Sequence, residues 1–178
     1  MSFDLSVIPN KNIILAVTGG IAAYKSAILV RRLKDQGFNV RVVMTHGAQA
    51  FITPLTFQAL SGNLVHTELL DPEAEAGMGH IELARWADLL LVVPASCDTL
   101  AKFAAGLADD LLSTLYLATK APVWVAPAMN QQMWAAKATQ RNLKTLVEDG
   151  VHVIMPDAGE QACGDVGLGR MPEPEEIA

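Results

Sequence analysis

Four short stretches of the sequence place small and polar residues directly after apolar runs. They are Thr18-Gly19-Gly20, Thr45-His46-Gly47, Pro94-Ala95-Ser96 and Pro127-Ala128-Met129-Asn130. If the apolar runs are parallel strands, these stretches meet at the carboxyl edge of one sheet, where open α/β sheets bind ligands. Glycines let backbone N–H groups come close to an anion, and a following helix N-terminus attracts it further. The sequence therefore predicts a phosphate site without a basic side chain, with hydroxyl donors from Thr18, Thr45, Ser96 and Thr99.

We expect this phosphate to belong to a mononucleotide. The dinucleotide fingerprint Gly-x-Gly-x-x-Gly is absent, because Ala22 and Ala23 follow Gly19 and Gly20. The acidic residue that would bind a ribose hydroxyl at the end of the second strand is also missing, since Thr45 stands there. FMN, which carries a single phosphate, fits such a site better than a nicotinamide dinucleotide.

Three residues are candidates for reactive groups. Asn130 follows a strand at the expected ligand edge, although Asn is also among the best helix N-caps. His80 begins an amphipathic helix, where a lone histidine is more often a surface residue. Cys163 lies in a glycine-rich stretch, which suits a reactive thiol, whereas Cys97 directly after a strand is expected to be inert. The four histidines and two cysteines show no short ligand spacing, so we expect no metal site.

Composition narrows the class of protein. Of the 178 residues, 51% are hydrophobic and 18% are charged, which predicts one domain with part of its surface covered by other subunits. The net charge of −6 argues against nucleic-acid binding. Two cysteines are too few for a disulfide framework. We see no signal peptide and no run of roughly 20 apolar residues that could span a membrane, so we expect a cytoplasmic protein.

The elements that must position these residues alternate along the chain. Short apolar runs predict strands at 13–18, 40–45, 89–93, 122–126 and 151–155, and helical patterns lie between them. This alternation predicts a three-layer α/β/α sandwich with a Rossmann-like (flavodoxin-like) parallel sheet. In the first helix, Ile21, Tyr24 and Ile28 share an apolar face.

Some boundaries are more specific predictions. Pro94 should end its strand, and one helix should continue from Asn130 to Gly150. A mobile acidic connection is expected at 71–79. Beyond Pro156 the sequence is too glycine-rich for helix or strand, which predicts a loop, with a disordered tail as the alternative. A last helix begins to form at 173–177.

Several motifs resemble those of the homo-oligomeric flavin-containing Cys decarboxylase family. The run from Pro127 to Trp134 is similar to its Pro-x-Met-Asn-x-x-Met-Trp signature, which is highly specific. The run from Pro94 to Thr99 resembles its Pro-Ala-Ser-Ala-Asn-Thr motif, with Cys97 and Asp98 as departures. The segment 79–83 resembles its catalytic-histidine segment, and Ala162-Cys163-Gly164-Asp165 resembles its substrate-recognition flap.

The resemblance implies roles for individual residues. Those implied to bind FMN are Gly19, Gly20, Ile21, Thr45, Ser96, Thr99 and Ala128. The implied catalytic residues are His80, Asn130 and Cys163. The implied substrate-binding residues are Asn130, Met133, Ala162, Cys163, Gly164 and Arg85, the last reaching a neighbouring subunit's site.

The resemblance also implies an activity: FMN-dependent decarboxylation of phosphopantothenoylcysteine to phosphopantetheine in coenzyme A biosynthesis, through a thioaldehyde and an ene-thiol. A homotrimer that assembles further into a dodecamer is implied, as is fusion to a CTP-dependent phosphopantothenate–cysteine ligase domain. We therefore expect residues 1–178 to be one decarboxylase domain, with a flap at 157–170 and the ligase domain excised. The alternatives are a flavin prenyltransferase and a non-catalytic flavin-binding regulatory subunit.

Overall fold

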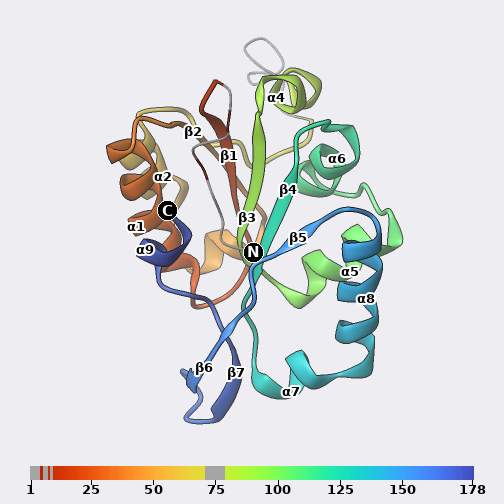
Figure 1. Cartoon of the computed structure of the whole chain (residues 1–178). Helices are drawn as coiled ribbons and strands as arrows, with labels where there is room; N and C mark the ends of the chain where they lie inside the picture. Colours follow the sequence, from red (N-terminus) through yellow and green to blue (C-terminus); the bar gives the residue numbers. More distant parts are fainter. Residues whose placement is uncertain (1–4, 6–7, 9, 71–78) are drawn as a thin grey trace.

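The five expected apolar runs form one parallel sheet in the computed structural model of the chain, which describes residues 5, 8, 10–70 and 79–178 (Figure 1). The strand order is β2-β1-β3-β4-β5, so the sheet grows outward in both directions from β1 and β3. Its strands are β1 (Asn12–Val17), β2 (Asn39–Met44), β3 (Leu89–Ala95), β4 (Val123–Pro127) and β5 (His152–Val153). The parallel pairing and the predicted fold class are confirmed.

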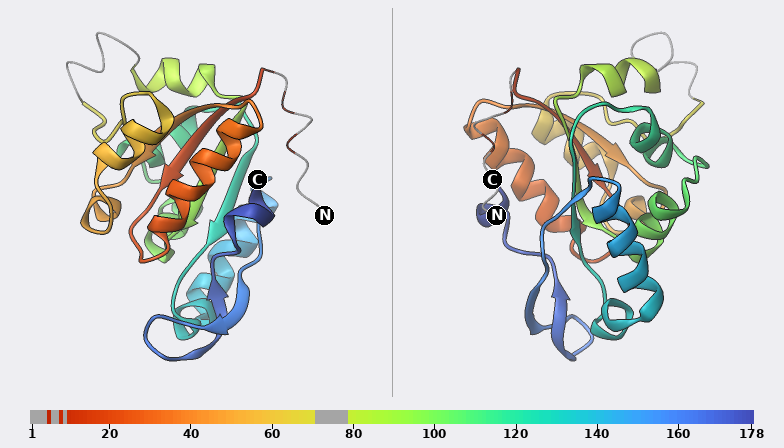
Figure 2. Two further views of the ribbon diagram at one scale, coloured as in Figure 1. Left: turned by 90° about the vertical axis from the view of Figure 1, so that its left-hand side faces the viewer. Right: turned by 45° about the vertical axis from the view of Figure 1, so that its right-hand side comes forward.

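Helices cover both faces of the sheet, as Figures 1 and 2 show. Neighbouring residues of a strand point to opposite faces, so Ile13 and Leu15 join one buried cluster while Ile14 and Ala16 join the other. One face is covered by α1 (Ala23–Asp35), α2 (Pro54–Ser61) and α9 (Pro174–Ile177), and the other by α4 (His80–Trp86), α5 (Cys97–Ala105), α6 (Leu111–Ala118) and α8 (Lys137–Glu148). The shorter helices are the 3₁₀ turn η2 (Gly47–Ala50) and α7 (Gln131–Ala135).

The first helix packs on the sheet with a different face from the one expected. Ile21, Tyr24 and Ile28 are exposed by 61%, 56% and 39%. The face toward the sheet instead carries smaller and branched side chains: Ala23, Ser26, Leu29, Val30 and Leu33. Three apolar side chains therefore line one exposed side of α1.

Two boundary predictions are wrong. Pro94 does not end β3, because the strand continues to Ala95, which pairs with Pro127 after a shift in register. The helix after Asn130 is not continuous either: Ala136, with φ −60° and ψ 134°, separates α7 from α8. The added end of β3 lies at the carboxyl edge of the sheet, where the predicted site residues are.

The glycine-rich segment beyond Pro156 is an antiparallel hairpin, not a loop or a disordered tail. Its strands are β6 (Asp157–Glu160) and β7 (Val166–Arg170). Figures 1 and 2 show it extending beyond the carboxyl edge of the sheet, beside α7. The expected acidic connection at 71–79 lies, apart from Gly79, outside the described residues.

The short helix α9 begins within the predicted 173–177 segment and packs against α1. Lys25, only 7% exposed, donates to the Met171 carbonyl at 3.1 Å and pairs with Glu173 at 2.7 Å. Arg32 pairs with Glu175 at 3.1 Å, and this pairing helps to hold the pKa of the exposed Glu175 below its usual value, after the larger effect of a backbone hydrogen bond. In the part of the chain that the structure describes, no helix has the length and apolar character needed to cross a membrane.

Candidate active site

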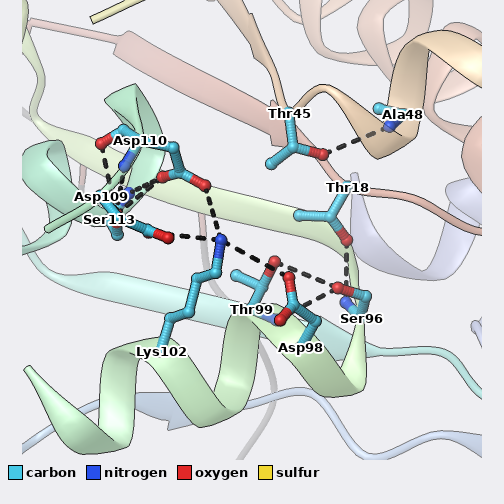
Figure 3. Close-up of polar contacts among 10 residues, drawn as sticks. All are labelled: Thr18, Thr45, Ala48, Ser96, Asp98, Thr99, Lys102, Asp109, Asp110 and Ser113. Carbon is cyan, nitrogen blue, oxygen red and sulfur yellow. Dashed lines mark hydrogen bonds and ion pairs between the residues drawn. The ribbon is translucent and has the colours of Figure 1, made fainter. Parts of the chain in front are cut away.

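The turns after β1, β3 and β4 are joined by hydrogen bonds at the carboxyl edge of the sheet. Thr18 donates its hydroxyl to the Pro94 carbonyl at 2.7 Å. The same hydroxyl accepts the Ser96 N–H at 2.8 Å (Figure 3). The Ala128 N–H donates to the Ala95 carbonyl at 3.1 Å. These bonds confirm that three of the four predicted stretches meet at one edge.

Thr18 is not available as a ligand donor, which corrects one expectation. Its side chain is fully buried, and its hydroxyl hydrogen is already donated to Pro94. The hydroxyls of the other three predicted donors, Thr45, Ser96 and Thr99, are arranged differently. Thr45 accepts the Ala48 N–H at 3.3 Å, and Ser96 donates to the Thr99 hydroxyl at 3.1 Å. Because each accepts a hydrogen bond, Thr45 and Thr99 keep their own hydroxyl hydrogens to donate.

The two glycines after β1 have different surroundings. A Cβ on Gly19 would lie 3.0 Å from the backbone carbonyl carbon of Gly47, so the turns after β1 and β2 touch through their backbones. A Cβ on Gly20 would meet nothing within 4 Å. Gly19 thus leaves little room for a side chain, whereas Gly20 leaves its backbone open toward the edge, as an anion cradle requires. Beside it, Ser96 caps the N-terminus of α5 by accepting the Thr99 N–H at 3.2 Å.

Asp98, a departure from the family motif, belongs to an ion-pair cluster around Lys102 (Figure 3). The Lys102 Nζ lies 3.6 Å from Asp98, 3.3 Å from Asp109 and 3.3 Å from Asp110. Burial opposes the charge on Lys102, but these carboxylates outweigh it and raise its pKa. Burial likewise opposes the charge on Asp110, but hydrogen bonds from Ser113 and the nearby Lys102 lower its pKa. The cluster joins α5 to the N-terminus of α6.

Asn130 takes the capping role that its sequence position suggested, and its amide group has a second set of contacts. Its Oδ1 accepts the Gln132 N–H at 2.8 Å and so caps α7. Because that oxygen must face an N–H group, the amide nitrogen is turned the other way. There, Nδ2 donates to Asp165 Oδ2 at 3.0 Å and lies 3.5 Å from the Cys163 sulfur.

Cys163 lies at the tip of the hairpin, together with Ala162 and Gly164. The Gly164 N–H donates to the Gln161 carbonyl at 2.8 Å, and the Gln161 N–H donates to the Asp165 carbonyl at 2.7 Å. These bonds close a three-residue loop in which Gly164 has φ +87°. This is the common three-residue hairpin connection, which needs a residue that tolerates positive φ at its last position. The loop presents the exposed Cys163 to Asn130.

Two further residues of the flap belong to this site, although the sequence analysis assigned no role to either of them. Gln161 accepts the Gln131 N–H at 3.0 Å and donates to the carbonyls of Met129 and Leu168, both at 3.3 Å. Asp165 accepts hydrogen bonds from Asn130 and, at 3.5 Å, from Cys163. A three-residue loop containing Gly between two short extended runs was the signal that would have placed both residues at a hairpin tip.

The hairpin is also seated on the signature segment through its backbone. The Met129 N–H donates to the Gly169 carbonyl at 3.0 Å, and a Cβ on Gly169 would clash with the Met129 carbonyl oxygen. Met133, a predicted substrate contact on the adjacent α7, is 47% exposed. Ala162 at the hairpin tip is exposed as well. The structure thus brings the flap residues together with Asn130.

His80 and Arg85 do not join this group within one chain. Both lie on α4, whose last residue Trp86 accepts a hydrogen bond from Asn12 at the amino end of β1. Figure 1 shows α4 at one end of the sheet and α7 with the hairpin at the other. The seven residues of β3 separate the two ends by about 20 Å. Within a single copy, His80 therefore cannot touch Asn130 or Cys163.

A cavity of about 560 Å³ lies away from this edge. It is lined by the C-terminal ends of α5, α6 and α8, and by Val123 at the start of β4. The rings of Phe103 and Tyr116 stack there with centroids 4.0 Å apart, and burial, with a smaller contribution from Asp149, raises the pKa of Tyr116. The predicted site residues do not line this cavity, so concavity alone would place a site at the opposite end of the sheet from most of them.

A parallel sheet with an open glycine turn, hydroxyl donors and a capped helix at its carboxyl edge defines a nucleotide-binding α/β protein. The family described as Flavoprotein matches residues 4–178, and the chain belongs to this flavoprotein family. It is 62% identical over 167 residues to the coenzyme A biosynthesis bifunctional protein CoaBC of Vibrio cholerae, an alignment that covers 94% of this chain and 42% of that protein. The chain thus spans less than half the length of such relatives.

Solved structures are similar over nearly the whole chain. A cysteine-to-serine mutant of PPC decarboxylase, complexed with pantothenoylaminoethenethiol, is 36% identical with a TM-score of 0.80 and 93% of each chain covered. The FMN-dependent cysteine decarboxylase SpaF is 32% identical with a TM-score of 0.79 and 94% of each chain covered. The similarity therefore includes both the sheet and the hairpin beyond it.

Proposed function

We propose that the chain is an FMN-dependent phosphopantothenoylcysteine decarboxylase, which forms phosphopantetheine on the route to coenzyme A. The observation that carries the proposal is the contact between Asn130 and the hairpin tip with Cys163, beside the phosphate cradle. Similarity to CoaBC and to cysteine decarboxylases supports this reaction. A flavin prenyltransferase or a regulatory subunit would not require a thiol presented to an amide in this way.

The residues at the carboxyl edge fit FMN. The open backbone of Gly20 and the hydroxyls of Thr45 and Thr99 would hold its phosphate, with Gly19 keeping the turn in place. Ser96, Ala128 and the exposed Ile21 would border the rest of the cofactor. When bound, FMN supplies the acceptor for a hydride from the carbon that carries sulfur, and returns that hydride at the end.

The chain's own residues would act on the substrate around this transfer. Loss of the hydride gives a thioaldehyde, and loss of CO₂ then leaves an ene-thiolate. One hydride and one proton on carbon convert the ene-thiolate to the product thiolate, and a further proton from water gives the product thiol. Cys163 would give the proton to carbon. Asn130 would hold the substrate's carboxylate or amide, since its Nδ2 is directed toward the hairpin tip. The flap, with Ala162 and Gly164 at its tip and Met133 opposite, would exclude water.

His80 would assist the first oxidation by binding the substrate's thiolate, and it would come from another copy of the chain. Its distance from Asn130 within one chain supports a site between subunits, and Arg85 on the same helix would reach the same neighbouring site. The exposed apolar side of α1 (Ile21, Tyr24 and Ile28) gives such a copy a surface to cover. The proposal therefore includes a homotrimer that assembles into a dodecamer.

The wider setting is part of the same proposal. Fusion to a CTP-dependent phosphopantothenate–cysteine ligase domain is supported by the bifunctional CoaBC relatives. On this proposal residues 1–178 form the decarboxylase domain, with the flap at 157–170. A cytoplasmic location is supported by Cys97 and Cys163, both of which are free thiols.

The test is an anaerobic reaction followed by spectroscopy and mass spectrometry. Protein loaded with FMN should absorb at about 370 and 450 nm, as flavins do. It should also convert phosphopantothenoylcysteine to CO₂ and phosphopantetheine. A protein that binds FMN but releases no CO₂ would contradict the decarboxylase function. A protein that binds no FMN would contradict the cofactor as well.

A mixing experiment tests the site between subunits. His80→Ala and Cys163→Ser should each form no product alone. When the two variants are co-expressed, about a quarter of the sites should become active, because each site then has an even chance of an intact His80 and an even chance of an intact Cys163. If both residues act within one chain, the mixture would be no more active than either variant. Co-expression of His80→Ala with a His80→Ala, Cys163→Ser double variant is the matched control, which should stay inactive.

A further inference from the structure

Asp165 lies where the two reactive side chains of the flap site meet. Its Oδ2 accepts a hydrogen bond from Asn130 Nδ2 at 3.0 Å and another from the Cys163 thiol at 3.5 Å. The third side of this triangle is the 3.5 Å contact between Asn130 Nδ2 and the Cys163 sulfur. We propose that Asp165 is a positioning residue that holds Cys163 as a protonated thiol against Asn130. This inference rests on the proposed role of Cys163 as a proton donor and deepens it.

The triangle is fixed by backbone structure on both sides. Cys163 and Asp165 belong to one closed loop, whose Gln161–Gly164 and Gln161–Asp165 hydrogen bonds set the distance between them. Asn130 is oriented independently, because its Oδ1 caps α7. The three groups are therefore held in place before any substrate binds, as an efficient site requires.

The chemistry of the contact favours the thiol over the thiolate. An ionised carboxylate can only accept a hydrogen bond, so the Cys163–Asp165 contact needs a hydrogen on sulfur. A thiolate at the same place would put two negative charges side by side. The other charges on α7 and the hairpin do not offset this repulsion. Helix α7 has no charged side chain, and the hairpin adds Asp157, Glu160 and Arg170, the last paired with Glu173 at 3.5 Å.

The arrangement also accounts for recovery after each turnover. When Cys163 gives its proton to the substrate carbon, a thiolate is left beside the Asp165 carboxylate. Repulsion between the two negative charges favours uptake of a proton from water, which restores the thiol. The cycle thus consumes one solvent proton.

Alkylation of Cys163 by iodoacetamide tests the proposal without substrate or turnover. Iodoacetamide reacts with the thiolate, and peptide mass spectrometry distinguishes Cys163 from Cys97. Asp165→Asn keeps an oxygen to accept from Asn130 but loses the charge, so its Cys163 should react about fivefold faster at neutral pH, the effect of one charge about 4 Å away in water. Asp165→Glu keeps the charge and should react at nearly the wild-type rate. An Asp165→Asn rate equal to or below the wild-type rate would overturn the proposal.

Turnover gives a second readout. With phosphopantothenoylcysteine, Asp165→Asn should release CO₂ but accumulate the ene-thiol, lowering kcat for phosphopantetheine more than it raises KM. Product formation at the wild-type rate would refute the positioning role. If the wild-type protein releases no CO₂ while the alkylation difference is found, the decarboxylase function fails and the thiol–carboxylate arrangement stands.

Discussion

Replacing Thr18 by Val tests whether one buried hydroxyl joins the turn after β1 to the end of β3. Valine has nearly the same shape, but it leaves the Pro94 carbonyl and the Ser96 N–H without their partner. An unsatisfied buried polar group costs about 1–3 kcal/mol. Because the Ser96 N–H is only partly buried and costs less, the variant should lose about 2–4 kcal/mol of the free energy of unfolding. Thr18→Ser keeps the hydroxyl and removes one buried methyl group, which costs about 1 kcal/mol.

The measurement is urea unfolding of FMN-free protein at a fixed protein concentration. With a urea dependence of about 2 kcal/mol per M, Thr18→Val should lower the midpoint by about 1–2 M and Thr18→Ser by about 0.5 M. Thr18→Val should also bind FMN more weakly than Thr18→Ser, because Gly20 and Ser96 would no longer be held in register. A Thr18→Val midpoint equal to or above that of Thr18→Ser would refute the reasoning.

Three further outcomes are expected. The pKa of Asp110 is lowered below 3.8 in the folded state, so the stability that its charge contributes is complete above pH 3.8 and is lost as the pH falls further. Asp110→Ala should therefore lower the free energy of unfolding in urea by about 1 kcal/mol at neutral pH, and the difference from wild type should shrink in acid. A difference that widens in acid would contradict this reasoning. Gln161→Ala removes three hydrogen bonds, so amide hydrogen exchange in β7 should become faster while exchange in β1 stays unchanged. Equal acceleration in both strands would show that Gln161 does not stabilise the hairpin alone. Gly19→Ala should destabilise the FMN-free protein through contact with Gly47, whereas Gly20→Ala should keep the wild-type stability and bind FMN more weakly. If the two variants are equally stable, the contact at Gly19 relaxes without cost.

The parallel sheet was predictable because its strands are buried on both faces. Such strands appear as continuous apolar runs, and the alternation of these runs with helical periods leaves few other folds. The facing of α1 was not predictable from apolar residues alone. Small residues such as Ala23 and Ser26 pack closely against the sheet, while the larger Ile21 and Tyr24 are left exposed.

The hairpin could not be predicted from composition. Its glycines suggested a loop, but Gly169 is needed because β7 runs directly against the Met129 carbonyl. That contact joins residues 40 positions apart in the sequence, and local propensity carries no information about it. The same reason explains why Gln161 and Asp165 were given no role: their contacts with Asn130, Gln131 and Met129 form only when the hairpin lies against that segment.

Residue types identified the edge of the sheet that carries the predicted site. They did not show which residues at this edge hold the turns together and which remain able to bind a ligand. Thr18 and Thr45 look alike in sequence, since each follows a strand and precedes glycine or a short helix. Only the structure shows that Thr18 is fully buried and bonded to Pro94, while Thr45 keeps a hydrogen to donate.

The two ends of the Asn130 side chain face different demands, because its oxygen caps α7 and its nitrogen meets the hairpin tip. Aspartate or serine would cap the helix equally well but would lose the amide N–H. On the proposed function, selection for turnover would accept neither replacement, although both keep the cap of α7. A screen for folded protein alone would therefore pass variants at this position that lack the proposed activity.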